Sequence, residues 1–184
     1  MNHDDHAHEA EQRALLITGT VGVGKTSAAD LLGDLLADAG LPHAIMDLDR
    51  LCQAWPAPHD DPFNSGLLLR NLRALSANYL DAGVRHLVLA GVAENRADRD
   101  HYQAAIGMPL TVCRLTADLP VVHSRLRRRH EADSDLKSLP WHLERAGRLD
   151  QILVEAGVAD FTIDTTHVPL AAVASAVLKA AGWT

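Results

Sequence analysis

The sequence predicts an α/β fold of three layers, in which helices cover both faces of a five-stranded parallel sheet. Short apolar runs alternate with stretches of helical periodicity along the whole chain of 184 residues, and this order is typical of parallel strands joined by helical crossovers. The apolar runs are continuous, which indicates strands that are buried on both faces. A glycine-rich loop between the first strand and the first helix completes the pattern.

The first half of the chain contains three predicted strands and two predicted helices. The run at 15–18 is the first strand, and residues 27–36 form a helix because four leucines recur there at helical spacing. A Gly-Leu-Pro turn leads to the second strand at 44–49, which ends in acidic residues. After a loop with three prolines, a helix is expected at 65–81, where a glycine follows its end, and residues 85–91 form the third strand.

The second half of the chain contains two further strands, expected at 110–115 and 160–164. Its helices are expected at 98–106, 116–130, 140–155 and 169–181. Thr116 is a suitable N-cap for the second of these helices, and Pro140 is suitable at the start of the third. Residues 131–139 are polar and lack periodicity, which indicates a mobile loop. We expect the segment from about 125 to 140 to form a lid.

The segment from Gly19 to Thr26 matches the pattern G-x-x-x-x-G-K-[ST] of a phosphate-binding loop. Glycines let backbone amides turn toward a polyphosphate, and the N-terminus of the following helix adds partial positive charge. The pattern predicts that Lys25 reaches the β- and γ-phosphates of ATP and acts in catalysis, and that the Thr26 hydroxyl holds Mg²⁺. The residues expected to bind the nucleotide here are Gly19, Val21, Gly22, Val23, Gly24, Lys25, Thr26 and Ser27.

Two carboxylates, Asp47 and Asp49, come at the end of the second predicted strand. Ligands of open parallel sheets bind outside the carboxyl ends of the strands, and two strand residues separated by one share a face. One carboxylate is expected to hold a Mg²⁺-bound water, and the other to orient an acceptor hydroxyl or take its proton. Gly91, the last residue of the third predicted strand, would allow the acceptor to approach the backbone closely, whereas Glu94 fits a surface position as well as the site.

The helix at 116–130 ends in an arginine-rich stretch that leads into the predicted lid. Phosphoryl transfer depends on positioning and charge stabilisation, so arginines near the γ-phosphate are expected. Arg125 and Arg129 lie four residues apart on one helix face, and we expect this pair to act on ATP. Asp164 and Thr165, at the end of the fifth strand, are expected to border the adenine.

Composition excludes several classes of protein. The formal net charge of −7 argues against a general nucleic-acid binder, and only two cysteines indicate a reducing compartment. The sequence shows no signal peptide and no apolar run long enough to cross a membrane, so we expect a cytoplasmic protein that binds neither nucleic acid nor membrane. Residues 1–12 are expected to be a disordered polar tail, whose histidines and acids could also bind metal, and residues 13–184 a single domain.

These features resemble the small P-loop kinases that phosphorylate metabolites, a group that includes adenylylsulfate, shikimate and gluconate kinases and chloramphenicol phosphotransferase. Asp47-Leu48-Asp49 is similar to the D-x-D motif after the second strand of shikimate and adenylylsulfate kinases. Three segments are similar to adenylylsulfate kinase in the same order: Asn71-Leu72-Arg73, Tyr79-Leu80-Asp81-Ala82-Gly83 and Arg96-Ala97-Asp98-Arg99-Asp100. The residues after the third strand differ from each of these families, which leaves the acceptor open.

The resemblance implies a nucleoside- and nucleotide-kinase-like P-loop fold with strand order 2-3-1-4-5. It implies that Asp47 supports Mg²⁺, that Asp49 touches the acceptor and that Arg73 lies in the acceptor region. We therefore expect an ATP-dependent, Mg²⁺-requiring enzyme that transfers the γ-phosphoryl group to a hydroxyl of a metabolite or antibiotic, as a monomer or homodimer. Two alternatives stay open, a nucleoside or nucleotide kinase and an ATP-binding regulatory module with no acceptor.

Overall fold

Five parallel strands form one sheet in the computed structural model, which describes residues 12–183. The strands are β1 (Arg13–Gly19), β2 (His43–Asp47), β3 (His86–Ala90), β4 (Leu110–Thr116) and β5 (Phe161–Asp164). Their order across the sheet is β2-β3-β1-β4-β5, and every neighbouring pair is parallel. The predicted fold class and strand order are therefore confirmed.

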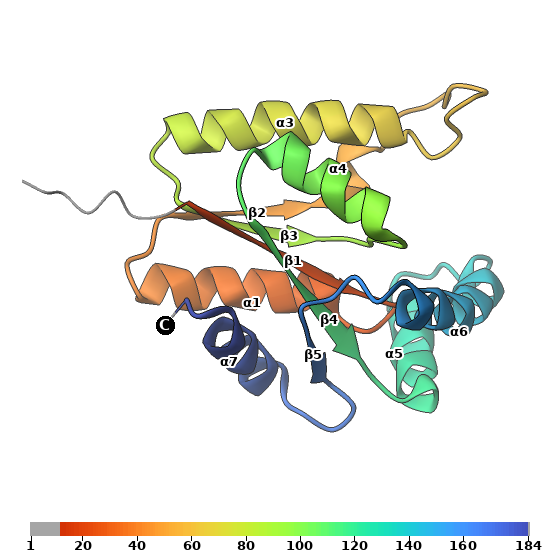
Figure 1. Cartoon of the computed structure of the whole chain (residues 1–184). Helices are drawn as coiled ribbons and strands as arrows, with labels where there is room; N and C mark the ends of the chain where they lie inside the picture. Colours follow the sequence, from red (N-terminus) through yellow and green to blue (C-terminus); the bar gives the residue numbers. More distant parts are fainter. Residues whose placement is uncertain (1–11, 184) are drawn as a thin grey trace, which may run out of the picture.

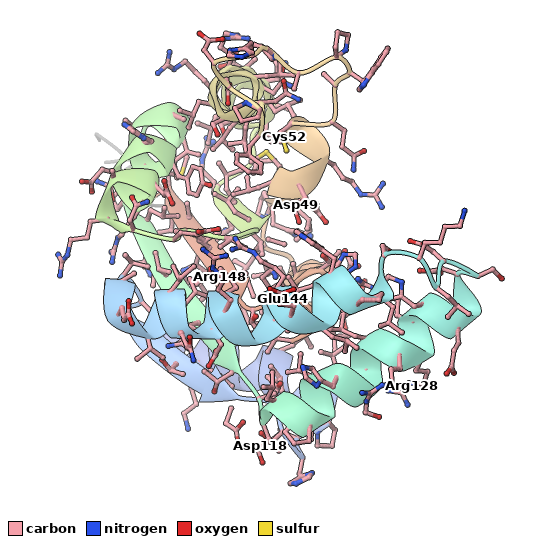
Figure 2. The ribbon with its side chains drawn as sticks, turned by 90° about the vertical axis from the view of Figure 1, so that its right-hand side faces the viewer. Asp49, Cys52, Asp118, Arg128, Glu144 and Arg148 are labelled. Atoms are coloured by element: carbon pink, nitrogen blue, oxygen red, sulfur yellow. The ribbon has the colours of Figure 1, made fainter. Side chains whose placement is uncertain are left out.

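Helices cover both faces of the sheet (Figure 1). They are α1 (Lys25–Asp38), α2 (Leu48–Leu51), α3 (Ser65–Asp81), α4 (Arg96–Ile106), α5 (Leu119–Ala132), α6 (Leu139–Ala156) and α7 (Leu170–Ala181). Helices α3 and α4 lie on one face, and α1 and α7 on the other. The strand arrows point toward α5 and α6, which lie beyond the C-terminal edge of the sheet; Figure 2 views the molecule from this side.

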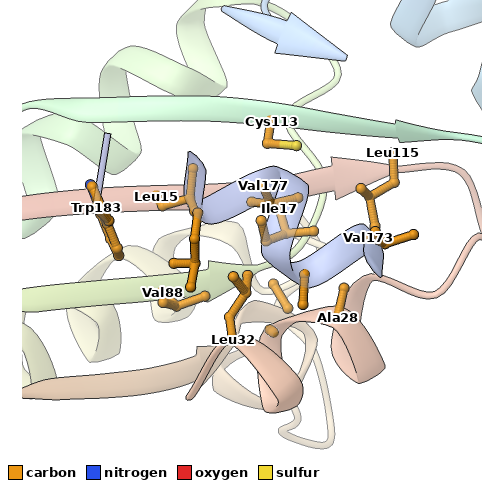
Figure 3. Close-up of a cluster of buried hydrophobic side chains, with 14 of the residues drawn as sticks. Leu15, Ile17, Ala28, Leu32, Val88, Cys113, Leu115, Val173, Val177 and Trp183 are labelled. Atoms are coloured by element: carbon orange, nitrogen blue, oxygen red, sulfur yellow. The ribbon is translucent and has the colours of Figure 1, made fainter. Parts of the chain in front are cut away.

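The central strand β1 carries the two halves of the hydrophobic core on its two faces. Leu15 and Ile17 point to the layer of α1 and α7, where Figure 3 shows them with Leu32 and Val177. Leu16, between them in sequence, belongs to the cluster on the opposite face. All three β1 side chains are fully buried, which explains why the strand reads as a continuous apolar run.

The second strand ends two residues earlier than predicted, and this changes the relation of the two acidic residues. Asp47 is the last residue of β2 and also the N-cap of α2, because its Oδ1 accepts a hydrogen bond of 3.0 Å from the backbone N–H of Asp49. Asp49 therefore lies in the first turn of a short helix. The expectation that both carboxylates share one face of a strand was wrong, since a capping interaction ends the strand between them.

The predicted start of α5 was also wrong. Thr116 is the last residue of β4, and the helix begins at Leu119 after an N-cap at Asp118, with Pro120 in its first turn. Proline fits there because the first helical N–H groups have no partner within the helix. The end of α5 lies at Ala132, so the loop before α6 spans residues 133–138 and is shorter than the expected 131–139.

The predicted polar tail at 1–12 lies, apart from its last residue, outside the described residues. Of the helices in the described part of the chain, none combines the length and apolar character needed to cross a membrane.

Candidate active site

The C-terminal ends of the strands border a cavity of about 1340 Å³. Its walls come from the phosphate loop, α2, the start of α3, the connection from β3 to α4, and helices α5 and α6. Ligand pockets commonly measure roughly 300–1,000 Å³, so this cavity has room for a nucleotide together with a second small molecule. Its position is the one expected for ligands of open parallel sheets.

The phosphate loop has the backbone geometry that its glycines permit. Gly24 has φ 106°, a left-handed value that strains other residues, and it forms the N-cap of α1 without any side-chain cap. The first amides of α1 are therefore available to an anion. Gly22 has φ 80°, and a Cβ there would lie 2.7 Å from Cγ of Leu126, so α5 packs closely over the loop.

Lys25 is held at the centre of the loop. Its Nζ donates hydrogen bonds to the carbonyls of Gly19 (3.0 Å) and Thr20 (3.1 Å), which leaves one of its three N–H groups for a ligand. The pKa of Lys25 is lowered from 10.5 to about 8, chiefly by burial and to a smaller extent by the positive charge of Arg129, while Asp49 and Asp47 act in the opposite direction. The ammonium group is therefore poorly compensated in the free protein, which favours an anionic ligand beside it.

Thr26 and Asp47 come together although 21 residues separate them in sequence. The Thr26 hydroxyl donates a hydrogen bond of 3.1 Å to Oδ2 of Asp47. Within residues 12–183, no group of three or more His, Cys, Asp or Glu side chains is arranged to hold a metal ion. A hydroxyl and a single carboxylate suit Mg²⁺, which takes oxygen ligands and commonly completes its shell with water and substrate phosphates.

Asp49 lines the cavity from α2, and its side chain is exposed. Figure 2 shows Asp49 and Cys52 on the α2 side, across from Glu144 and Arg148 of α6, and all four residues line the cavity. Asp49 also contributes to the electrostatic environment of Lys25. The carboxylate thus shares the cavity with the phosphate loop and with α6.

The two predicted arginines of α5 both line the cavity, in different settings. Arg125 donates to the carbonyl of Val23 (3.2 Å) and to both the hydroxyl (3.0 Å) and the carbonyl (2.6 Å) of Thr165. It therefore ties the phosphate loop to the end of β5. Arg129 lies one helical turn further along and close enough to Lys25 to lower its pKa. Thr165 is buried and lines the cavity beside Arg125.

Sequence reasoning missed the role of α6. The Thr20 hydroxyl donates a hydrogen bond of 2.5 Å to the carbonyl of Ala146, and the neighbouring Arg145 forms an ion pair with Glu94. Glu94 is held in turn by its backbone N–H, which donates to Oδ2 of Asp98 at 2.8 Å. The partners in the Thr20–Ala146 and Glu94–Arg145 contacts are 126 and 51 positions apart in sequence, so no local sequence pattern predicts these contacts. The one available signal was the pair of arginines at 145 and 148, one turn apart on a predicted helix.

Five predicted site residues do not line the cavity. One of them, Asp47, is hydrogen-bonded to Thr26, which does line it. Arg73 is exposed on α3. A Cβ at Gly91 would lie 2.6 Å from Cδ1 of Leu48, so this glycine makes room for α2 and not for an acceptor. The Asp164 carboxylate accepts hydrogen bonds from the hydroxyl (2.6 Å) and N–H (3.1 Å) of Thr166, which lower its pKa. Gly19 contributes through its carbonyl, which binds Lys25.

Comparison with known proteins gives matches at the level of structure. No family model matches the chain, and no curated protein matches it in sequence. The tunicamycin resistance protein of Deinococcus radiodurans is similar with a TM-score of 0.68 and 22% identity, over 95% of this chain and 98% of that one. Shikimate kinase of Acinetobacter baumannii, solved with shikimate, gives a TM-score of 0.60 and 16% identity, over 95% of each chain.

A third similar structure contains both a nucleotide and a sulfonucleotide. The APS kinase of Mycobacterium tuberculosis, in complex with AMPPNP and APS, has a TM-score of 0.56 and 22% identity, over 94% of this chain and 98% of that one. Together these likenesses show that the chain has the fold of the P-loop metabolite kinases.

Proposed function

We propose that this protein is an ATP-dependent, Mg²⁺-requiring small-molecule kinase that transfers the γ-phosphoryl group to a hydroxyl of a metabolite or antibiotic. The observation that carries the proposal is that Lys25, Thr26 and Asp49 line one cavity large enough for two ligands, while Asp47 is hydrogen-bonded to Thr26. The fold is that of kinases of small metabolites, which supports the same conclusion.

The phosphates of ATP fit the loop around α1. The uncapped N-terminus of α1 offers backbone amides and partial positive charge, and Lys25 offers a buried ammonium group with one unused N–H. Arg125 and Thr165 lie where the loop meets the end of β5, a position suited to the nucleoside part. Asp164 is not proposed to contact the adenine, because its carboxylate already accepts hydrogen bonds from Thr166.

Thr26 and Asp47 are the residues that would hold the metal ion. When bound, Mg²⁺ neutralises phosphate charge and supports the transfer electrostatically. Asp47 also has a structural role, because its Oδ1 caps α2 and thereby fixes the position of Asp49. The metal site and the acceptor site are thus connected through three residues of backbone.

Asp49 is the candidate for orienting the acceptor hydroxyl. In the transfer, the acceptor oxygen forms a bond to the γ-phosphorus, the bond from that phosphorus to the bridging oxygen of ADP breaks, and the hydroxyl proton passes to the Asp49 carboxylate. Arg129 is the α5 arginine best suited to the developing charge, because it lies near Lys25. Arg125 is already bonded to three oxygen atoms and acts mainly by positioning the loop.

The rival proposal of a nucleoside or nucleotide kinase finds less support. A nucleotide acceptor needs arginines that grip its phosphate. The two candidates for this role, Arg70 and Arg73, are exposed on α3 and outside the cavity lining. The cavity wall on the α3 side is formed instead by Ser65, Leu68 and Leu69.

A coupled ADP-release assay tests the proposal across a panel of sugars, nucleosides, antibiotics and sulfonucleotides. We expect at least one hydroxylated compound to raise the rate of ADP release well above the rate measured without an added acceptor. Lys25→Ala should abolish this increase while the protein stays folded. Normal turnover by folded Lys25→Ala would contradict the assignment of the phosphate loop.

A further inference from the structure

The cavity is divided by charge, and the division bears on the chemical class of the acceptor. Positive side chains gather at the phosphate end: Lys25, Arg125, Arg128 and Arg129. The opposite end is formed by α2, α3 and the segment from β3 into α4, and we call it the acceptor half. The charged residues that line it from these elements are three carboxylates, Asp49, Glu94 and Asp98.

Helix α6 faces the acceptor half and supplies the remaining charges. Arg145 is bonded to Glu94, so its charge is already balanced. Arg148 is exposed, and Glu144 lines the cavity beside it with the opposite charge. Four carboxylates and two guanidinium groups therefore surround the acceptor half. The Arg145 guanidinium is paired with Glu94, whereas Arg148 is an exposed residue of the α6 wall.

Tyr102 of α4 also lines the acceptor half and is influenced by the same negative charges. Its hydroxyl donates a hydrogen bond of 2.9 Å to the carbonyl of Val92. Burial raises the pKa of Tyr102, and the negative charges of Asp98, Asp49 and Glu94 raise it further. All three carboxylates thus lie close enough to the Tyr102 hydroxyl to interact with it electrostatically.

Apolar side chains form the rest of this wall. Leu68 and Leu69 of α3 are partly buried and line the cavity, as does Val92. At the mouth, Phe63 on the loop before α3 and Trp141 on α6 also line the cavity, with 81% and 60% of their surfaces exposed. Large exposed aromatic residues at a cavity mouth favour a ligand that covers them.

We propose that the acceptor is a hydroxyl compound that is neutral or positively charged and carries an apolar part that packs against Phe63 and Leu69. An anionic acceptor would place its charge among Asp49, Glu94 and Asp98, and α2, α3 and α4 contribute no Lys or Arg to the cavity lining. This inference rests on the proposed kinase reaction, since it concerns the second substrate of that reaction.

Native Cys52 allows a test that needs neither ATP nor a known acceptor. Its partly buried thiol lines the acceptor half, whereas Cys113, the other cysteine, is completely buried in the core. Methanethiosulfonate reagents react by attack of the thiolate on sulfur with release of methanesulfinate. Three reagents are compared: the trimethylammonium-ethyl form is cationic, the sulfonatoethyl form is anionic and the methyl form is neutral. The rate constant of each reagent with Cys52 is divided by its rate constant with free mercaptoethanol. Because all are used at one pH, the thiolate fraction cancels from the ratios.

We expect the cationic reagent to modify Cys52 about 10-fold or more faster than the anionic reagent at low ionic strength. The ratio should approach one in 1 M salt, where charges are screened over roughly 3 Å. Asp98→Asn should lower the ratio by about twofold or more, because removing one negative charge slows the cationic reagent and speeds the anionic one. Glu94→Gln provides a second variant. Asp100→Asn is the matched control, because Asp100 lies on α4 outside this cavity.

A separate comparison of two uncharged reagents tests whether the acceptor half binds an apolar group. A benzyl reagent should modify Cys52 faster than the methyl reagent after the same normalisation, and Phe63→Ser should reduce this advantage. Trp55→Ser is the control, because Trp55 is 94% exposed on the same loop and does not line the cavity.

Three outcomes would overturn the inference: an anionic reagent at least as fast as the cationic one, no benzyl advantage, or no modification of Cys52 by any reagent. The last would show that the acceptor half is closed to molecules of this size. Cys52→Ser confirms the reacting site. Since the reaction uses no nucleotide, its failure leaves the kinase assignment standing, and a failed ADP-release assay leaves the charge measurement standing.

Discussion

The hydroxyl of Thr20 donates a hydrogen bond of 2.5 Å to the main-chain carbonyl of Ala146, and both residues are buried. The bond joins the second residue of the phosphate loop to the middle of α6. The neighbouring Arg145 binds Glu94, at the start of the connection to α4. Helix α6 is thereby bonded both to the phosphate loop and to the acceptor half of the cavity.

Thr20→Val removes this donor with little change in shape. We expect the free energy of unfolding to fall by about 1–3 kcal/mol, because the Ala146 carbonyl is left buried without its partner. Thr20→Ser should restore most of the loss, since serine keeps the hydroxyl. Chemical denaturation of the three proteins measures the effect, and equal stability of the valine and wild-type proteins would show that the contact contributes nothing.

Asp47→Asn should raise the Mg²⁺ concentration needed for half-maximal activity by about 10-fold or more. Asparagine can still cap α2 through its side-chain oxygen, but it lacks the negative charge that a metal ion beside Thr26 requires. The measurement is activity, or binding of a non-hydrolysable ATP analogue, over a Mg²⁺ titration. Asp34→Asn, on the exposed side of α1, is the control and should leave the Mg²⁺ dependence unchanged.

Nucleotide affinity should fall as the pH rises above about 8, the pKa to which burial lowers Lys25. Below this value the free protein already carries the ammonium charge that the phosphates need. Above it, the complex must take up a proton, so the dissociation constant should rise up to about tenfold per pH unit. Calorimetry in buffers of different ionisation enthalpy measures the proton uptake. Lys25→Met should bind weakly at every pH, and a pH dependence that persists in it would assign the titration to another group.

Much of the fold and part of the site followed from sequence because their signals are local. The phosphate loop, the apolar strands and the periodic helices each occupy one stretch of chain, and these stretches determine the sheet. The shape of the acceptor half did not follow, because contacts such as Glu94–Arg145 join residues 51 positions apart. Gly91 shows the same limit: a glycine after a strand indicates close approach, but the sequence does not say that the neighbour is Leu48.

The segment predicted to form a lid is bonded to α5 through His130. Its buried ring donates from Nδ1 to the carbonyl of Asp135 at 2.6 Å, which fastens the loop at 133–138 to the end of α5. We expect closure to move this loop together with Arg129. Hydrogen exchange of residues 131–139 should therefore slow when a non-hydrolysable ATP analogue and Mg²⁺ are saturating. Equal exchange in the free and bound states would remove the lid from the mechanism.

Transfer of label from ATP radiolabelled at the γ-phosphate tests the central claim most directly. The protein is incubated with the acceptor panel, and labelled products are separated from orthophosphate. We predict a labelled small molecule with wild-type protein and none with Lys25→Ala. Asp49→Asn should transfer about 10²- to 10⁴-fold more slowly with nearly unchanged ATP affinity, whereas Asp60→Asn, outside the cavity lining, should match wild type. Label found only in orthophosphate across the whole panel, from protein that binds ATP, would contradict the kinase assignment and favour a regulatory module.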